Sequence, residues 1–393
     1  MRMREFRRAG HTPSLIAALL HFDVSFAIWV ILGALGAYIA EDLGLSAAQK
    51  GVVVAIPLLS AAVCRVTFGV LADRFGPRRV GTVSMSIALV PLVWAWLGAS
   101  TVTQLYGVGA LLGVAGASFA ISLPLASRWY PAQYQGLAMG IAGAGNSGTV
   151  ACALVAPRLA EHLGWHATMG LAIIPALLVL CAFRLLAKEP PAPAERLTLG
   201  AFAAMLRERD AWKLCGLYAV TFGGFVGLSS FLPIFFHDQY GLSKVDAASL
   251  AAIGGACGSF VRPFGGHLAD RIGGTRVLTG VYGLAAPLLL FLAGMPRIGL
   301  AAVGFPLVMS ALGLGNGAVF QLVGLRFRAR IGVVTGLVGA AGGLGGFLLP
   351  IAFGSLHDRF GGYGAGLTLA ATVVVVALVG VTLAQRRSWS AVT

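Results

Sequence analysis

The chain has 393 residues, of which 58% are hydrophobic and only 11% are charged. A soluble domain carries about 25% charged residues, so this composition excludes an ordinary soluble enzyme, a disordered chain and a nucleic-acid-binding protein. It predicts an all-α membrane protein. The net charge of +14 is then expected to orient the chain in the bilayer rather than to bind nucleic acid.

The sequence contains twelve apolar runs separated by charged residues, Pro or Gly. Each run reaches the roughly 20 residues that a bilayer-spanning helix needs, and none alternates apolar with polar residues as a strand would. The expected transmembrane helices are 14–40, 47–72, 79–99, 104–127, 135–158, 165–187, 213–236, 243–269, 276–295, 299–324, 331–354 and 361–385. The first run is too long for a cleavable signal peptide, so we expect it to be retained.

A polar, Pro-rich stretch separates the sixth run from the seventh. It predicts an N-terminal six-helix half (1–187), a cytoplasmic linker (188–212) and a C-terminal six-helix half (213–393). Of the 28 Lys and Arg residues, 21 fall on the side of the termini, five on the opposite side and two inside predicted helices. The positive-inside rule therefore places both termini in the cytoplasm, with the protein in the cytoplasmic (inner) membrane.

A short sequence recurs at half the chain length. Residues 65–80 (RVTFGVLADRFGPRRV) and 262–277 (RPFGGHLADRIGGTRV) share nine identities in sixteen positions at an offset of 197. The repeat predicts two halves related by a pseudo-twofold axis normal to the membrane. In each copy, an Asp, a turn-forming Gly and following Arg residues form a loop that can latch the halves in one access state. The predicted gating residues are Asp73, Arg74, Arg79, Asp270, Arg271 and Arg276.

Segment 69–79 (GVLADRFGPRR) resembles the signature of the loop between helices 2 and 3 in the major facilitator superfamily. Segment 266–276 resembles the weaker counterpart between helices 8 and 9. The resemblance covers essentially the whole chain, and it implies the twelve-helix fold of that superfamily.

Two arginines lie inside predicted helices, at the same position of the two repeat copies. Arg65 and Arg262 each precede the boundary aspartate by eight residues, which is about 12 Å along a helix and near the midplane of a hydrocarbon layer about 30 Å thick. Of the 14 acidic residues, only Asp23 lies deep in a predicted helix. The excess of positive charge predicts an anionic substrate. The alternative is a structural role, with each arginine bonded to carbonyls at a broken helix.

Glycine-rich stretches occur at related positions of the fifth and eleventh helices, as GIAGAGNSG (140–148) and GAAGGLGGFLLP (339–350). Glycine at helical spacing lets backbones approach closely and slide, whereas a buried Asn146 needs polar partners. Together with one arginine in each of helices 2 and 8, these stretches resemble the nitrate/nitrite porter family within the superfamily. The glycines concerned are Gly143, Gly145, Gly148, Gly342, Gly343 and Gly345.

This resemblance implies a secondary active transporter of nitrate, nitrite or both, working by alternating access. In that family two arginines clamp the planar anion and aromatic rings cover its faces, and Arg65 and Arg262 match the clamp. The matching lining residues are Phe119, Tyr218, Phe222 and Asn146, with Asn316 as a further candidate. Asp23 is a candidate for proton coupling or for neutralising an arginine, so proton symport and nitrate/nitrite exchange both stay open.

Other functions fit the sequence less well. A transporter of a different small anion, such as a short carboxylate, keeps the fold and the arginine pair, but the Gly/Asn stretches favour nitrate. A drug or cation exporter needs acidic lining, which the sequence lacks, and a sensor needs a signalling domain. No Ser/His/Asp set, metal-ligand cluster or nucleotide loop predicts an enzyme or a cofactor. We expect a monomer whose partners are the anion, protons if they are coupled to transport, and the lipid bilayer.

Overall fold

The computed structural model describes residues 3–191, 206–327 and 331–385, and these residues form helices joined by short turns. The N-terminal helices are α1 (Met3–Ala9), α2 (Thr12–Trp29), α3 (Ile31–Ala34), α4 (Gly36–Leu43), α5 (Ala47–Phe75), α6 (Pro77–Gly98), α7 (Val102–Gly116), α8 (Phe119–Ser127), α9 (Ala132–Gly143), the 3₁₀ turn η1 (Ala144–Ser147), α10 (Gly148–Leu171) and α11 (Ile173–Leu186). The C-terminal helices are α13 (Arg209–Tyr240), α14 (Lys244–Phe260), α15 (Arg262–Ile272), α16 (Gly274–Ala293), α17 (Ile298–Arg326), α18 (Ile331–Phe360) and α19 (Gly364–Ala384).

Each expected transmembrane run falls on helical segments, which confirms the all-α membrane fold. In the described ranges, ten helical stretches are long and apolar enough to cross a membrane. One of them, Ala138–Leu186, covers two predicted runs, because Gly164 with φ 77° and ψ 161° breaks the helix inside it. The predicted run 243–269 is divided into α14 and α15, each shorter than a full span. The number of twelve helices therefore stays a prediction.

Several predicted runs are broken near their middle, and the breaks have local causes. Val261 separates α14 from α15, and Pro263, which lacks an N–H, lies in the first turn of α15. Another break separates α7 from α8, where the N–H of Ala120 bonds the carbonyl of Ala117 instead of that of Gly116. Such breaks leave backbone carbonyls free to accept hydrogen bonds from side chains.

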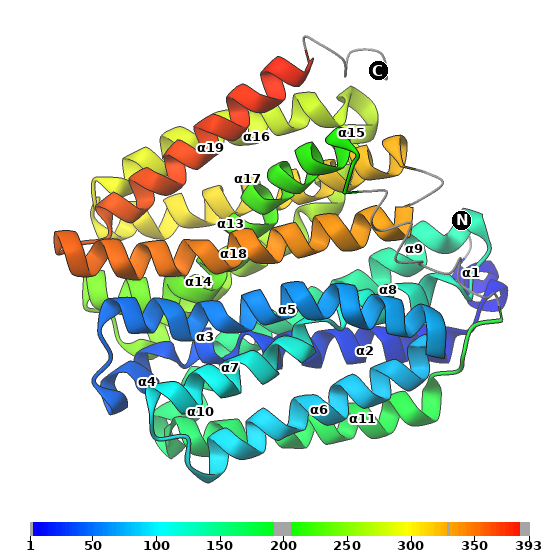
Figure 1. Ribbon diagram of the computed structural model, residues 1–393, viewed down its shortest axis with the longest axis horizontal. Helices are drawn as coiled ribbons and strands as arrows, with labels where there is room; N and C mark the ends of the chain where they lie inside the picture. Colours follow the sequence, from blue (N-terminus) through cyan, green and yellow to red (C-terminus); the bar gives the residue numbers. More distant parts are fainter. Residues whose placement is uncertain (1–2, 192–205, 328–330, 386–393) are drawn as a thin grey trace.

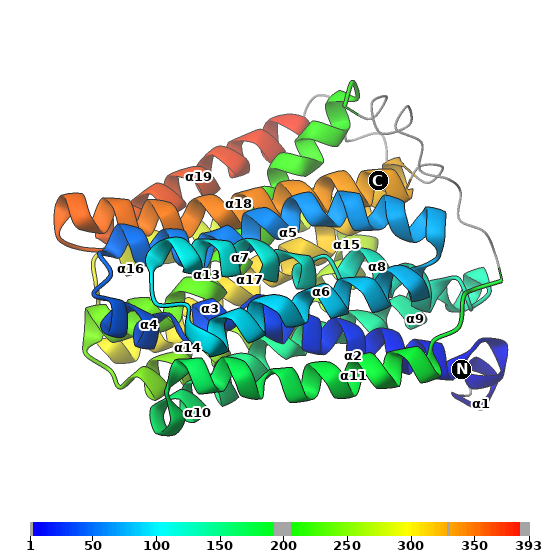
Figure 2. The same ribbon diagram turned by 60° about the horizontal axis from the view of Figure 1, so that its bottom comes forward.

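The N-terminal and C-terminal helices lie side by side, with α1 and the last turn of α19 at the same end of the molecule (Figure 1). Both views place α5 along α18, at the boundary between the two groups (Figure 2). Glycines make this packing close: a Cβ added at Gly343 would lie 2.7 Å from that of Ala62, and Gly51 and Gly354 likewise meet backbone across the α5–α18 contact. The glycine-rich stretch of α18 thus positions α5, which carries Arg65.

At the end opposite α1, polar contacts join the N-terminal helices to the C-terminal ones. Lys50 lies 2.6 Å from a carboxylate oxygen of Asp238. The carboxylate of Asp358 accepts the N–H groups of Ala47 and Ala48, at 3.1 and 2.9 Å, and so caps α5 from the other helix group. We call this end the closed end. From this end, α5 and α18 pack closely along their length, from the contact of Gly354 with Ala47 to that of Gly343 with Ala62.

Candidate functional site

Arg65 lies at the centre of the bundle on α5 and is only 4% exposed. Its Nε donates to the Gly116 carbonyl at 3.1 Å, and its Nη1 donates to the Gly339 carbonyl at 3.2 Å. The first carbonyl is available because the helix breaks at Ala117. The remaining nitrogen, Nη2, is buried and has no hydrogen-bond partner in the described residues. Arg65 is therefore held in place by backbone but keeps one charged donor free for a ligand.

Arg262, the repeat counterpart, begins α15 and is partly exposed. Its Nη2 donates to the hydroxyl of Tyr218 at 3.2 Å. Gly317 of α17 packs so closely on the backbone of Arg262 that a Cβ at this glycine would overlap the Arg262 carbonyl. No ion pair to an Asp or Glu is found for Arg65 or Arg262 in the part of the chain that the structure describes. Their charges are therefore not neutralised by carboxylates there.

Aromatic rings surround both guanidinium groups. The Phe222 ring centroid lies 5.2 Å from the Cζ of Arg65 and 5.6 Å from that of Arg262. Tyr218, one turn away, stacks on Phe222 with centroids 5.0 Å apart and an interplanar angle of 4°. Trp29 adds a third ring at 5.0 Å from Arg65. These rings supply cation–π contacts and a flat apolar wall beside the two arginines, and Tyr218 and Phe222 of this wall are among the predicted lining residues.

Phe119 lies beside Phe320 rather than over the arginines. The two ring centroids are 6.5 Å apart, and Phe320 also meets the Tyr218 ring at 5.0 Å in an edge-on contact. Phe119 is on α8 and Phe320 on α17, so the pair bridges the two helix groups next to the arginine site. Sequence reasoning missed Phe320. Its signal was its position one helical turn after Asn316 in the segment NGAVF.

The glycines of α18 make room for the aromatic wall. A Cβ at Gly342 would lie 2.6 Å from the Tyr218 ring and 2.9 Å from the Phe222 ring. Gly343 faces α5 and Gly345 faces α13, each against backbone or Cβ atoms. Any larger residue at these three positions would push the aromatic wall or the neighbouring helices away.

Two glycines of the fifth predicted run allow close packing against α2. Gly145 and Gly148 pack on the backbone of α2 at Asp23, whereas no atom lies within 4 Å of a Cβ built on Gly143. The Asp23 carboxylate accepts the hydroxyl of Ser147 at 2.6 Å. Asp23 is partly exposed, and it bonds neither arginine.

Asn146 is 4% exposed and reaches toward the C-terminal helices. Its Nδ2 donates to the hydroxyl of Ser259 at 2.6 Å. In this conformation the amide thus joins η1 to α14 and makes no hydrogen bond to Arg65 or Arg262. Its predicted role as a substrate contact stays a prediction.

Asn316 of α17 is a second buried amide beside the site. It is 0% exposed, and neither its Oδ1 nor its Nδ2 has a hydrogen-bond partner in the described ranges. It lies on α17 between Gly315 and Gly317, at the level where α17 touches the backbone of Arg262. An unpaired buried amide costs about 1–3 kcal/mol. A ligand or water between α17 and the arginines would remove that cost.

The predicted gating loops have separate contacts. The carboxylate of Asp73 pairs with Arg128, and Arg74 lies over the ring of Phe75 at 5.2 Å. The backbone N–H of Arg79 donates to Glu189 at 3.2 Å. Arg128 directly follows α8, Phe75 ends α5, and Glu189 lies just after α11, so none of these partners comes from the C-terminal helices.

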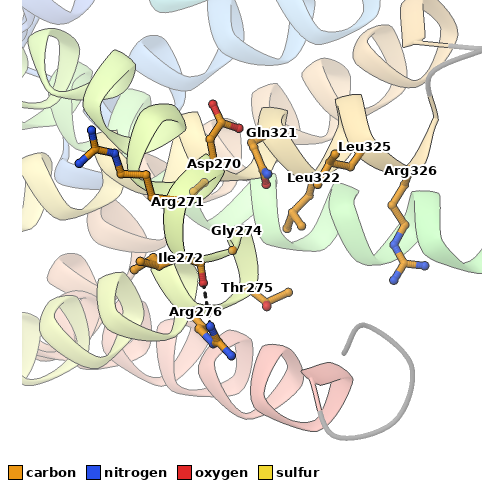
Figure 3. A pocket seen from close by; sticks show the side chains of 12 residues that line it. Asp270, Arg271, Ile272, Gly274, Thr275, Arg276, Gln321, Leu322, Leu325 and Arg326 are labelled. Carbon is orange, nitrogen blue, oxygen red and sulfur yellow. Dashed lines mark hydrogen bonds between the residues drawn. The ribbon is translucent and has the colours of Figure 1, made fainter. Parts of the chain in front are cut away.

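The loop at the repeat position in the C-terminal helices lines a cavity instead. The cavity has a volume of about 390 Å³ and lies between the start of α16 and the last turns of α17 (Figure 3). Asp270, Arg271 and Arg276 are among its lining residues. It is distinct from the central arginine site.

The chemistry available at the centre is ion binding. Two guanidinium groups, a phenol and a wall of aromatic rings can hold a small planar anion by hydrogen bonds at its edge and ring contacts on its faces. The described residues contain no group of three His, Cys, Asp or Glu side chains placed to hold a metal ion.

Known proteins give independent comparisons. A family model described as Major Facilitator Superfamily matches residues 17–350. The chain is 33% identical to "Nitrite extrusion protein" of Bacillus subtilis (strain 168) over 92% of its length and 91% of that protein. It is 35% identical to "Probable nitrate/nitrite transporter NarK2" of Mycobacterium tuberculosis, over 94% and 95% of the two chains.

Solved structures support the same fold. The structure of a bacterial homologue of the human lysosomal transporter Spinster, in an inward-facing and occupied conformation, matches with a TM-score of 0.74. The match covers 95% of this chain and 96% of that one, at 20% sequence identity. At this identity the likeness concerns the fold.

Proposed function

This chain belongs to the Major Facilitator Superfamily, and from that premise we propose that it carries nitrate, nitrite or both across the membrane by secondary active transport. The relatives named for nitrate or nitrite cover more than nine-tenths of the chain at 33–35% identity. The chemistry of the central site agrees with such a cargo, because nitrate and nitrite are small, planar and singly charged.

The observation that carries the proposal is the free donor of Arg65. A guanidinium that is 4% exposed, with two nitrogens bonded to carbonyls and the third unpartnered in the described residues, leaves a charged N–H group unsatisfied. Leaving such a group unpaired costs more than the roughly 1–3 kcal/mol of a neutral one. An anion bound between Arg65 and Arg262 would recover that free energy and balance the charge. If Arg65 had only a structural role, its guanidinium would bond backbone carbonyls. Such bonds are present, but they use Nε and Nη1 and leave Nη2 without a partner in the described residues.

Alternating access supplies the transport step. We assign residues 1–187 and 213–393 to two six-helix halves that rock about the arginine site, joined by the cytoplasmic linker 188–212. The positive-inside bias then makes the closed end the extracellular one, with both termini in the cytoplasm. In this assignment Lys50–Asp238 and the Asp358 cap of α5 hold the outside shut.

The glycines and gating loops belong to the same cycle. The α18 glycines lie between α5 and α13 with no side chain to interlock, so α18 can shift along both helices as the halves rock. Asp73 and Asp270, with the arginines that follow them, would close the cytoplasmic side in the opposite state. In this structure Asp73 pairs with Arg128, which belongs to the same half of the molecule. This pairing fits a state in which the cytoplasmic side is not latched.

Asp23 is the candidate for proton coupling. Its carboxylate accepts a hydrogen bond from Ser147, and its backbone packs against Gly148 at the break of the fifth run. A proton gained there would weaken the contact between α2 and η1 while the anion is bound nearby. Asp23→Asn separates the two coupling modes, because it should abolish proton-driven uptake and spare nitrate/nitrite exchange.

Uptake of labelled nitrate into proteoliposomes tests the proposal. Vesicles loaded with nitrite, nitrate or formate should accelerate nitrate entry in the first two cases and not in the third. Arg65→Gln should reduce uptake at least about hundredfold, since it removes a charged ligand from a buried site. Arg297→Gln, which removes the same charge at the closed end, is the matched control and should transport normally. Acceleration by formate alone would assign the chain to small carboxylates instead.

A further inference from the structure

Two polar contacts join α10 of the N-terminal helices to α14 of the C-terminal helices, and both helices lie toward the closed end (Figure 1). Beside the glycine stretch of the fifth run, Nδ2 of Asn146 donates to the hydroxyl of Ser259 at 2.6 Å. Twelve residues later in the chain, Nη2 of Arg158 donates to the hydroxyl of Ser249 at 3.0 Å. Twelve residues span about 18 Å at 1.5 Å per residue. The two contacts therefore mark the inner and outer ends of one interface between the helix groups.

The outer contact differs from the ion pairs that join the helix groups at the closed end. Lys50 pairs with Asp238, and Lys244 pairs with Glu41. Arg158 bonds a neutral hydroxyl instead, and no ion pair to an Asp or Glu is found for it in the described ranges. If the helix groups separate at this end, each lysine leaves a carboxylate on the opposite surface, whereas Arg158 leaves only a serine. The α10–α14 interface would thus open as a surface with an unpaired positive charge.

A small cavity lies within this interface. Its volume is about 20 Å³, which exceeds the roughly 10–15 Å³ that one water molecule needs. Its lining includes Thr149 of α10, Gly255 of α14 and Ser229 of α13. The hydroxyl oxygen of Ser229 is buried and has no hydrogen-bond partner among the described residues, and a Cβ built on Gly255 would lie 3.9 Å from it. The interface therefore contains a further polar group that can donate to a ligand.

The contact between α5 and α18 offers a different surface. Its close approaches are made by glycines against alanine or backbone atoms, as where a Cβ built on Gly343 would lie 2.7 Å from that of Ala62. Such a surface has no side-chain donor for an anion, and an anion that leaves water needs donors in place of its hydration shell. The α10–α14 interface has three side-chain donors, on Arg158, Ser229 and Asn146.

We propose that Arg158 is the outer docking residue for the transported anion and that the α10–α14 interface is the route from there to the arginine site. The inference rests on the proposed function, in which the closed end opens to the outside. As α10 and α14 separate, Arg158 and Asn146 lose the hydroxyls that accept from them, and an anion supplies stronger acceptors. Arg158 is exposed, so its charge raises the anion concentration at the opening. Ser229 then donates along the route.

The rates at which charged thiol reagents reach the cavity test this proposal. Ser229→Cys replaces the hydroxyl by a thiol of similar size, and the full-length variant is reconstituted in proteoliposomes with the closed end outward. Two membrane-impermeant methanethiosulfonates are added outside, one carrying a sulfonate and one a trimethylammonium group, and each rate is divided by that with a free thiol in solution. We expect the sulfonate reagent to react faster and to stop nitrate uptake. The parent, with its five native cysteines, gives the background rate.

The preference for the sulfonate reagent should depend on Arg158. Arg158→Gln in the same variant should lower it about fivefold, because the charge at the opening is lost, and Arg158→Lys should keep it. The matched control is Arg297→Gln, which removes an arginine elsewhere at the closed end and should leave the preference unchanged. Thr149→Cys places the thiol on another wall of the cavity and should give the same order of rates.

The proposal is overturned if neither new thiol reacts faster than the parent, if the two reagents react equally, or if the two arginine variants change the preference equally. Nitrate uptake by the parent is measured separately. A chain that shows the charge preference but moves no nitrate would refute nitrate as the cargo and leave the anion route supported.

Discussion

Arg65 and Arg262 occupy the same position of the repeated sequence, yet their surroundings differ. Arg65 is 4% exposed and bonded to carbonyls of two other helices, α7 and α18. Arg262 is partly exposed and bonded to a single side chain, the Tyr218 hydroxyl. Phe222 is the ring that both guanidinium groups share. One arginine is thus fixed by backbone, and the other is held by a group that can move with α13.

This difference suggests that the two arginines have different roles in anion binding, although the repeat relates their positions. A fixed guanidinium defines where the anion binds, and a movable one can follow the anion as the helices shift. Backbone carbonyls cannot change rotamer, so Arg65 keeps its place only while α7 and α18 keep theirs. Four predictions test the distinction, in order of decreasing effect.

Replacing each arginine by lysine separates the two roles. Arg65→Lys should lower nitrate affinity about hundredfold, because an ammonium group cannot reach two carbonyls on different helices and also bind the anion. Arg262→Lys should lower it only about tenfold, since a movable ammonium can still approach the anion. Isothermal titration of nitrate into purified protein measures both values. The reverse order of the two losses would contradict the distinction.

The shared ring can be displaced without touching either arginine. In Gly342→Ala the new methyl group would lie 2.6 Å from Tyr218 and 2.9 Å from Phe222, so the rings must shift at a cost of about 1–3 kcal/mol. We expect nitrate affinity to fall about tenfold. Gly143→Ala adds the same methyl group where no atom lies within 4 Å, so it should bind nitrate as the parent does. Equal affinities for the two variants would show that the aromatic wall is not part of the site.

Replacing Asn316 tests whether its buried amide is part of the arginine site. Asn316→Leu removes two unpaired polar atoms and keeps the branching of the side chain, so the nitrate-free protein should become more stable by about 1 kcal/mol. Its nitrate affinity should fall several-fold, because the amide no longer contacts the anion or its water. Melting temperatures with and without nitrate measure both effects. A less stable variant with an unchanged response to nitrate would assign Asn316 a structural role.

The sequence predicted the helical membrane fold, and the structure brings the two predicted arginines together with the rings of Tyr218 and Phe222. The fold and the repeat position of the arginines follow from hydropathy and a repeat offset, whereas the two rings were expected from the resemblance to the nitrate/nitrite porter family. The structural alternative predicted carbonyl partners for Arg65 but not which carbonyls, because these depend on a helix break at Ala117 that frees the carbonyl of Gly116.

The bond from Asn146 to Ser259 and the position of Phe320 were also beyond the sequence. Both depend on how α14 and α17 pack against the N-terminal helices, and no local pattern encodes a contact between residues more than a hundred positions apart. The same limit applied to Glu189, whose carboxylate fills the turn of the first repeat copy.

The smallest expected effect concerns the single bond that holds Arg262. Tyr218→Phe keeps the ring and removes the hydroxyl that accepts from Arg262, so one hydrogen bond worth about 1 kcal/mol is lost, and nitrate affinity should change about fivefold. The matched control is Tyr282→Phe, which removes a buried hydroxyl bonded to the Leu217 carbonyl at 2.9 Å. That variant should lose stability while its nitrate affinity stays the same. If Tyr218→Phe matched Arg65→Lys in its effect, Arg262 would be as firmly fixed as Arg65, and the asymmetry between the arginines would have no functional meaning.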